Sequence, residues 1–154
     1  MRTRTILMTV AFCLIAVALC AAQNPNMGTW QLNEAKSKIT PGFAKNTTVV
    51  YAAAGDSIKV TTDGTDKDGK PVHGEWTGKF DGKDYPVTGD PSVDTRAYTQ
   101  IDKNTLSLTN KKAGKVTVTG KIVVSPGGKS RTLTTSGTGA DGKKVTSVSV
   151  YDKQ

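Results

Sequence analysis

Residues 116–151 read VTVTGKIVVSPGGKSRTLTTSGTGADGKKVTSVSVY. Apolar and polar residues alternate in three runs of this stretch, and the pairs Gly128-Lys129 and Gly142-Lys143 separate one run from the next. Alternation with a period of two is typical of a strand with one buried face, and glycine provides the positive φ that tight hairpin turns require. The stretch therefore predicts three antiparallel strands joined by tight turns. These strands span residues 116–124, 130–136 and 144–151.

The same pattern continues toward the N-terminus. Three more Gly-Lys pairs, which begin at Gly69, Gly82 and Gly114, lie between alternating runs. The further strands are expected over residues 28–32, 47–53, 57–62, 72–80, 83–87, 94–101 and 105–109. A meander of about ten short strands forms an up-and-down barrel or a sandwich. We predict an all-β fold, an antiparallel up-and-down β-barrel of about 8–10 strands, because a closed barrel leaves no unpaired strand edge.

The N-terminal segment differs in composition from the rest of the chain. Arg2 and Arg4 precede an apolar stretch at residues 6–19, and small residues follow it. This order is typical of a secretory signal peptide, and the apolar stretch is too short for an ordinary membrane span. We predict a signal peptide over residues 1–22 and a single domain over residues 23–154. The domain is expected to be exported, periplasmic or secreted, with no transmembrane span after signal removal.

Both cysteines, Cys13 and Cys20, fall inside the predicted signal peptide. Lipidation of Cys20 is the alternative to cleavage after Ala22, but bacterial lipoprotein signals have a small residue before that cysteine, and here it is Leu19. Without cysteines, an exported domain depends for its stability on its core and its hydrogen-bonded sheet.

The chain is basic, with a net charge of +8, or +6 without Arg2 and Arg4. A basic face for nucleic acid or anionic lipid is one interpretation. The lysines stand mostly at turns and are interspersed with aspartates, and no basic cluster has aromatic residues beside it. This placement favours the other interpretation, in which lysine keeps the strands soluble and discourages edge pairing. We expect a monomer with no nucleic-acid partner.

Short motifs along the domain resemble those of a known superfamily. Gly28-Thr29-Trp30 opens the domain and Val150-Tyr151-Asp152-Lys153 closes it, with Asn104-Thr105-Leu106 and the turn Gly127-Gly128-Lys129 between them. In order and approximate spacing, these motifs resemble the calycin superfamily, which contains the lipocalins and the fatty-acid-binding proteins. The resemblance implies a small exported bacterial-type lipocalin-like protein, whose barrel surrounds a cavity for a small apolar ligand.

The chain departs from the fatty-acid-binding proteins in two ways. Residues 33–46 are too few for their helical lid, so a capping loop with one helical turn is expected there and the barrel lacks a lid. The arginine that they place two residues before the final tyrosine is Ser149 here. Lys121, near their second basic position, falls on the opposite face from Val118. These departures favour a neutral apolar ligand over a fatty acid held through its carboxylate.

The inner face of the barrel is the expected ligand site. Trp76 shares a face with apolar neighbours and is either core or cavity wall, and the same residues could also fill the interior completely. The candidate ligand-binding residues are Val72, Trp76, Phe80, Leu106, Leu108, Val118, Leu133 and Tyr151.

Motifs that suggest catalysis or a cofactor have structural explanations. The G-x-G-x-x-G match at residues 137–142 precedes a strand instead of the helix that a phosphate site needs. His73 is the single histidine, and the alternation places it on the opposite face of the strand from Trp76, toward solvent. It has no cysteine partners with which to bind zinc. We expect no catalytic residue, no metal and no cofactor. The predicted function is non-catalytic binding of a small apolar ligand; the alternative is a structural or protein-interaction module of the cell envelope with a filled barrel.

Overall fold

The computed structural model describes residues 24–139 and 141–154, most of which lie in ten strands. The strands are β1 (Gly28–Leu32), β2 (Lys45–Ala54), β3 (Ser57–Thr65), β4 (Pro71–Gly78), β5 (Tyr85–Thr88), β6 (Thr95–Asp102), β7 (Thr105–Lys112), β8 (Lys115–Val124), β9 (Ser130–Thr138) and β10 (Lys144–Lys153). The predicted signal peptide, residues 1–22, lies outside the described residues. Among the described residues, no helix is long and apolar enough to cross a membrane.

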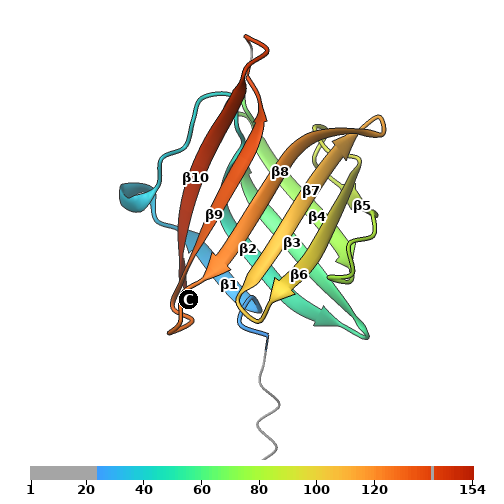
Figure 1. Ribbon diagram of the computed structural model, residues 1–154, viewed down its shortest axis with the longest axis vertical. Coiled ribbons are helices and arrows are strands. Elements are labelled where there is room, and N and C mark those ends of the chain that lie inside the picture. The colour runs from blue at the N-terminus through green and yellow to red at the C-terminus, as the bar shows by residue number, and fades with distance from the viewer. Residues whose placement is uncertain (1–23, 140) are drawn as a thin grey trace, which may run out of the picture.

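Each strand pairs antiparallel with its neighbours in the chain, and β1 also pairs with β10, so the sheet closes on itself (Figure 1). The closing seam runs from Trp30, opposite Lys153, to Leu32, opposite Tyr151. This ring confirms the predicted all-β, antiparallel up-and-down barrel and excludes the sandwich. Closure joins the backbone of the first strand to that of the last and leaves no open edge in the ring.

The Gly-Lys pairs form turns between strands, as the sequence predicts. The glycine of all five pairs has a positive φ, from 69° at Gly128 to 82° at Gly69. Glycine enters this left-handed region without the steric penalty that a Cβ brings, so these positions fix where each strand reverses. The lysines that follow are all exposed: Lys70, Lys83, Lys115, Lys129 and Lys143.

Two residues differ in position from the sequence expectation. β4 ends at Gly78, and Phe80 lies in the connection to β5, where it still packs against the core. Val116, which the alternation places on the inner face with Val118, is 56% exposed. The register of β7 against β8 shifts beside it, and such an irregularity breaks the alternation of faces.

The connection between β1 and β2 contains the predicted single helical turn. Asn33 caps the 3-10 helix η1 (Glu34–Lys36), because its Oδ1 accepts a hydrogen bond from the backbone N of Lys36 at 3.1 Å. Beyond η1, Lys38 forms an antiparallel bridge with Val148 of β10. The connection therefore extends the wall along β10, and η1 projects from it beside that strand (Figure 1).

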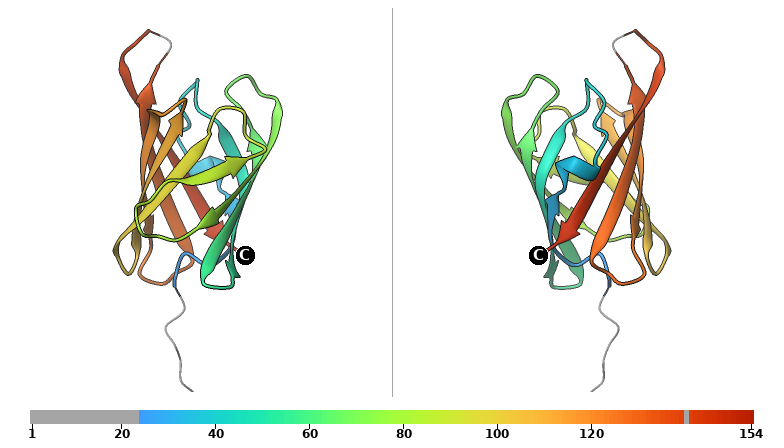
Figure 2. Two further views of the ribbon diagram at one scale, coloured as in Figure 1. Left: turned by 90° about the vertical axis from the view of Figure 1, so that its right-hand side faces the viewer. Right: turned by 90° about the vertical axis from the view of Figure 1, so that its left-hand side faces the viewer.

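The barrel interior has two halves. One end of the barrel carries the C-terminus and the β8–β9 turn, and the other end carries the β3–β4 and β9–β10 turns (Figures 1 and 2). We call the half at the first end the closed half and the half at the other end the open half. In the closed half the inward side chains are large and buried: Trp30, Tyr51, Trp76, Leu106, Ile122, Val124 and Tyr151. In the open half the inward side chains are smaller and partly exposed: Val72, Val118, Leu133 and Val145.

Candidate ligand-binding interior

Trp30 seals the closed half. Its side chain has no exposed surface, and its Nε1 donates a hydrogen bond to the backbone O of Asn26 at 2.8 Å. The Nζ of Lys153 lies 5.2 Å from the centre of the indole ring and donates to the backbone O of Pro25. These contacts tie the segment before β1 and the end of β10 to the same ring, so this end of the barrel is shut.

A group of aromatic rings fills the space above Trp30. Trp76 and Tyr98 meet edge to face with 4.8 Å between their ring centres, and Phe80 stacks on Trp76 at 6.3 Å. The Nε1 of Trp76 donates to the backbone O of Arg96 at 2.8 Å. Trp76 is 1% exposed and has its polar atom satisfied, so it is part of the packed core in this structure.

Arg131 on β9 projects into these rings. Its Cζ lies 4.7 Å from the centre of the Trp30 ring, 4.8 Å from that of Tyr51 and 5.0 Å from that of Tyr151. An aromatic face attracts a cation at such distances. The residue is 2% exposed, and its Nε and Nη1 have no hydrogen-bond partner within the described residues. Three rings hold the guanidinium, yet part of its hydrogen-bonding capacity is unused.

A second buried arginine, Arg96 on β6, reaches the same region. Its Nε donates to Oδ1 of Asn110 at 2.7 Å, and its Nη1 donates to the hydroxyl of Tyr98 at 3.4 Å. That hydroxyl lies 3.5 Å from the hydroxyl of Tyr51, whose ring contacts Arg131. We call these five residues, Tyr51, Arg96, Tyr98, Asn110 and Arg131, the central polar cluster.

The tyrosines beside Arg131 keep their protons. Burial raises the pKa of the Tyr51 phenol well above its ordinary value, and Tyr98 raises it further, although Arg131 acts in the opposite direction. Burial also raises the pKa of Tyr151, again against Arg131. Because both phenols are neutral at physiological pH, they can donate hydrogen bonds but supply no negative charge to the guanidinium.

The open half has an apolar inner surface that is partly exposed to solvent. A Cβ added at Gly120 would lie 3.0 Å from the Cγ of Leu108, and one added at Gly137 would lie 3.5 Å from the Cζ of Phe43. Glycine therefore lets these neighbours approach the wall closely. Val118 lies beside Gly137 and is partly exposed although it faces inward, so water reaches the inner surface of this half.

The eight predicted ligand-binding residues all lie on the inner side of the barrel, but their surroundings differ. Five belong to the buried core or pack against the rings of the closed half: Trp76, Phe80, Leu106, Leu108 and Tyr151. Three are partly exposed, Val72, Val118 and Leu133, and of these Leu133 also packs against the core. In this structure, the second group is the part of the predicted site that is exposed to solvent.

The sequence reasoning missed Arg96, Asn110 and Arg131. The signal that could have found the two arginines is the alternation itself, because Arg96 stands two residues before Tyr98 and Arg131 two before Leu133. Each arginine therefore shares a face with an inward neighbour. No lysine among the described residues is buried, so both buried cations of this part of the chain are arginines.

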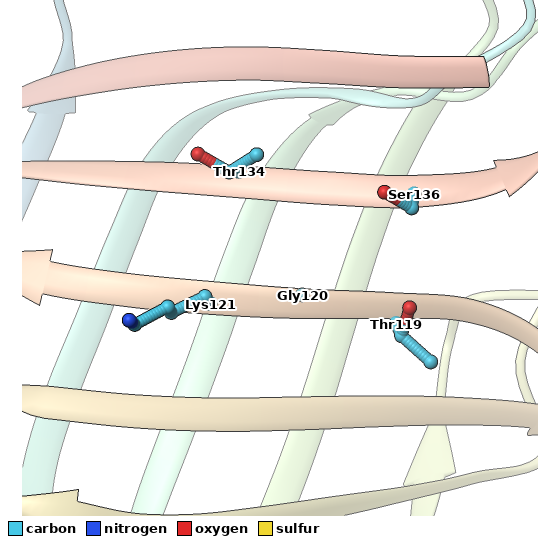
Figure 3. A pocket seen from close by; sticks show the side chains of 5 residues that line it. All are labelled: Thr119, Gly120, Lys121, Thr134 and Ser136. Atoms are coloured by element: carbon cyan, nitrogen blue, oxygen red, sulfur yellow. The ribbon is translucent and has the colours of Figure 1, made fainter.

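The surface hollows lie on the outside of the wall. One, of about 390 Å³, lies over Gly120, between Thr119 and Lys121 of β8 and Thr134 and Ser136 of β9 (Figure 3). Lys121 is exposed there, as the alternation predicts. A second hollow, of about 240 Å³, lies along the seam between β4 and β5. Both are lined mainly by polar or small side chains.

His73 lies on the outer face of β4, as predicted. Its Nδ1 is 2.6 Å from Oδ1 of Asp63, and its Nε2 is 3.5 Å from Oε1 of Glu75. Hydrogen bonds to these carboxylates, with Asp63 first, raise the pKa of the imidazole. Across residues 24–139 and 141–154, no three His, Cys, Asp or Glu side chains gather in a way that would hold a metal ion.

No protein-family model matches this sequence, and no curated protein matches it. Among solved structures, the redesigned β-barrel mFAP1 bound to DFHBI matches with a TM-score of 0.45 and 18% identity, over 84% of this chain and 95% of that chain. The redesigned β-barrel b11L5F_LGL matches with a TM-score of 0.44 and 17% identity, over 88% of this chain and 97% of that chain.

Proposed function

We propose that this protein is an exported, non-catalytic binding protein that holds a small, largely apolar molecule in the open half of its barrel. The contrast between the two halves of the interior carries the proposal. Trp30 and Trp76 fill and seal the closed half, whereas Val118 and Leu133 face inward in the open half and remain partly exposed. A closed barrel with a filled floor and an open, apolar upper half has the shape of a cup.

The energetic reason for binding is the apolar surface that the cup leaves in contact with water. Transfer of apolar surface out of water contributes roughly 25 cal/mol per Å², and a ligand seated between Val72, Val118 and Leu133 would remove water from all three side chains. Small-molecule sites are typically concave and mostly apolar, with a few polar groups that set orientation. The open half provides the apolar part of such a site.

Fluorescence titration of the purified protein with phenylnaphthylamine, an uncharged probe that brightens in apolar surroundings, tests the proposal. We expect saturable binding to the wild type. Val118→Trp places a large ring in the open half and should weaken binding at least about tenfold, the effect of losing about 1.4 kcal/mol of binding free energy.

Val123→Trp is the matched control. Val123 lies on the same strand but on the outer face, where it is 41% exposed, so the same substitution adds a ring outside the barrel. It should leave the affinity unchanged. Equal effects of the two substitutions, or no binding by the wild type, would contradict the proposal.

Export is the second part of the proposal, and its support is the N-terminal sequence. The full chain, expressed in a bacterium, should be recovered outside the cytoplasm with Gln23 as its first residue. Intact-mass measurement checks this, because cleavage after Ala22 and lipidation at Cys20 give different masses. A cytoplasmic protein of full mass would rule export out.

An interaction module of the cell envelope is the second candidate function. The observation in its favour is that the hollows lie on the outer wall, over Gly120 and along the β4–β5 seam, while rings fill the closed half. Substituting Lys121 and Thr134 in the first hollow should abolish capture of a protein partner if this function is correct. The same substitutions should leave phenylnaphthylamine binding unchanged.

A further inference from the structure

The segment before β1 forms the floor of the closed half. It makes a tight turn, in which the backbone N of Met27 donates to the backbone O of Asn24 at 3.0 Å. The Oδ1 of Asn24 also accepts hydrogen bonds from the backbone N of Asn26 at 3.0 Å and from its Nδ2 at 3.2 Å. Asn26 has no exposed surface, and Met27 packs against the hydrophobic core. We call residues 24–27 the floor strap.

Side chains from both ends of the domain hold the floor strap in place. The backbone O of Asn26 accepts a hydrogen bond from Nε1 of Trp30 at 2.8 Å, and the backbone O of Pro25 accepts one from Nζ of Lys153 at 3.3 Å. A longer contact, at 3.5 Å, joins the side chain of Asn24 to β6. The strap is therefore bound to β1, β6 and β10, and it leaves the floor only when several of these contacts break together.

The predicted cleavage bond of the signal peptide, between Ala22 and Gln23, lies one residue before the floor strap in the sequence. Both residues fall outside the described part of the chain, but their separation from Asn24 is limited by the length of the backbone. One residue of extended chain spans at most about 3.6 Å. A peptidase that engages this bond therefore has a single residue on its C-terminal side before it meets the floor. Proteases cut most readily where the chain is exposed and free of such packing.

We infer that the floor strap withholds the Ala22–Gln23 bond from signal peptidase once the barrel has folded, so that signal removal precedes the closing of the floor. A protease cuts a protected bond only in the fraction of molecules in which the protecting segment has opened. Opening the strap breaks its bonds to Trp30 and Lys153 and exposes the buried Asn26. The inference rests on the proposed export and adds an order of events to it: a precursor that folds too early keeps its signal peptide.

Cleavage of the folded full chain by purified bacterial signal peptidase, in a mild detergent, tests the inference. The comparison is a variant with about six glycine and serine residues inserted between Gln23 and Asn24, which add up to about 20 Å of chain between the bond and the strap. Circular dichroism checks that both precursors are folded. The folded wild type should be cut at least about tenfold more slowly than the variant, because its bond is available only while the strap is open.

Export in living cells provides the control for recognition of the bond. The wild type and the insertion variant have the same cleavage bond and the same residues before it. Signal peptidase meets each chain during export, before the barrel has folded. Cells should therefore remove the signal peptide from both chains to the same extent, as intact-mass measurement will show.

Two tryptophan substitutions show whether the strap itself protects the bond. Trp30→Phe removes the hydrogen bond to Asn26, and it should speed cleavage of the folded chain about threefold or more, because the strap opens more often. Trp76→Phe is the matched control. It removes a hydrogen bond of the same length, 2.8 Å from Nε1 to the backbone O of Arg96, away from the strap, and it should leave the rate unchanged. If Trp30→Phe does not fold, the insertion variant alone decides.

The outcomes separate the inference from the proposed export. Slow cleavage of the folded wild type that the insertion relieves supports the inference. Equal rates for the two folded precursors overturn it and leave export intact. Equal acceleration by Trp30→Phe and Trp76→Phe also overturns it, because cleavage would then require unfolding of the whole barrel. If cells remove the signal peptide from neither chain, or from the insertion variant alone, the proposed export and the inference fail together.

Discussion

Arg131 and Tyr151 are paired directly across β9 and β10, and the guanidinium carbon lies 5.0 Å from the centre of the tyrosine ring. The hydroxyl of Tyr151 continues past this contact and donates to the backbone O of Asn46 on β2 at 3.0 Å. One side chain therefore connects three strands: Tyr151 belongs to β10, its ring contacts Arg131 of β9, and its hydroxyl donates a hydrogen bond to Asn46 of β2.

Two substitutions of Tyr151 separate the contribution of its ring to stability from that of its hydroxyl. Tyr151→Phe keeps the aromatic face and removes one hydrogen bond, so the free energy of unfolding should fall by about 1 kcal/mol. Tyr151→Leu also removes the ring from a buried site that contains Arg131, and we expect a loss of about 3 kcal/mol. Urea unfolding measures both changes. Equal losses in the two variants would show that the ring itself does not contribute to stability.

Gly78 is a position where any side chain would meet the aromatic core. A Cβ there would lie 2.5 Å from Cγ of Tyr85 and 2.7 Å from Cζ2 of Trp76. Because these rings are packed against each other, Gly78→Ala should destabilise the protein by about 1–3 kcal/mol. Gly127→Ala is the control, since nothing lies within 4 Å of its Cβ position, and its effect should stay within about 0.5 kcal/mol. Thermal unfolding compares the pair.

His73 gives the stability of the barrel a pH dependence. Its pKa in the folded protein lies above the ordinary value of 6.5, because Asp63 and Glu75 form hydrogen bonds with the imidazole. The stabilisation is therefore complete below the unfolded pKa and is lost as the pH rises through the folded pKa. The difference in unfolding free energy between wild type and His73→Gln should shrink as the pH rises from about 6 to about 8.

The same residue can be titrated directly, because it is the only histidine in the chain. The NMR titration midpoint of His73 should lie above 6.5 and move down in Asp63→Asn, which removes the strongest partner. A midpoint at or below 6.5 in the wild type would mean that the contacts with Asp63 and Glu75 do not form in solution.

The wall of the barrel is weakest at β5. Two residue pairs join β5 to β4 and two join it to β6, whereas nine join β9 to β10. Pro86 also removes one amide donor from this short strand. In hydrogen-exchange mass spectrometry, peptides that cover β5 should exchange sooner than those that cover β9 and β10, because local opening breaks fewer bonds. Equal protection of the two regions would contradict this prediction.

The sequence predicted the strands of the wall well, because each strand depends on local information. The turn glycines, such as Gly128 and Gly142, need only their own positive φ, and alternation is visible within one strand. The choice between barrel and sandwich is different. It depends on the pairing of Trp30 with Lys153 and of Leu32 with Tyr151, which joins the two ends of the domain. The alternation within either strand does not reveal which other strand it pairs with.

The interior was harder to predict, because a charged residue on an inward position is an exception to the alternation rule. Arg96 and Arg131 fit the inner face by position and oppose it by type. Arg131 becomes tolerable only because Trp30 and Tyr51 reach it from other strands, and those contacts are invisible to the sequence of β9. Trp76 is the opposite case, because both its residue type and its position fit the inner face. The sequence could not show whether it belongs to the packed core or lines a cavity.

The pairing of β1 with β10 also affects how the barrel folds. Until Tyr151 and Lys153 are in place, β1 and β9 both present unpaired backbone groups, and such edges are prone to pair with other chains. Contacts between residues so distant in sequence form late and slow the folding of β-rich domains. The ring therefore closes only after β10 has been synthesised, so the last strand of the chain decides when these edges are covered.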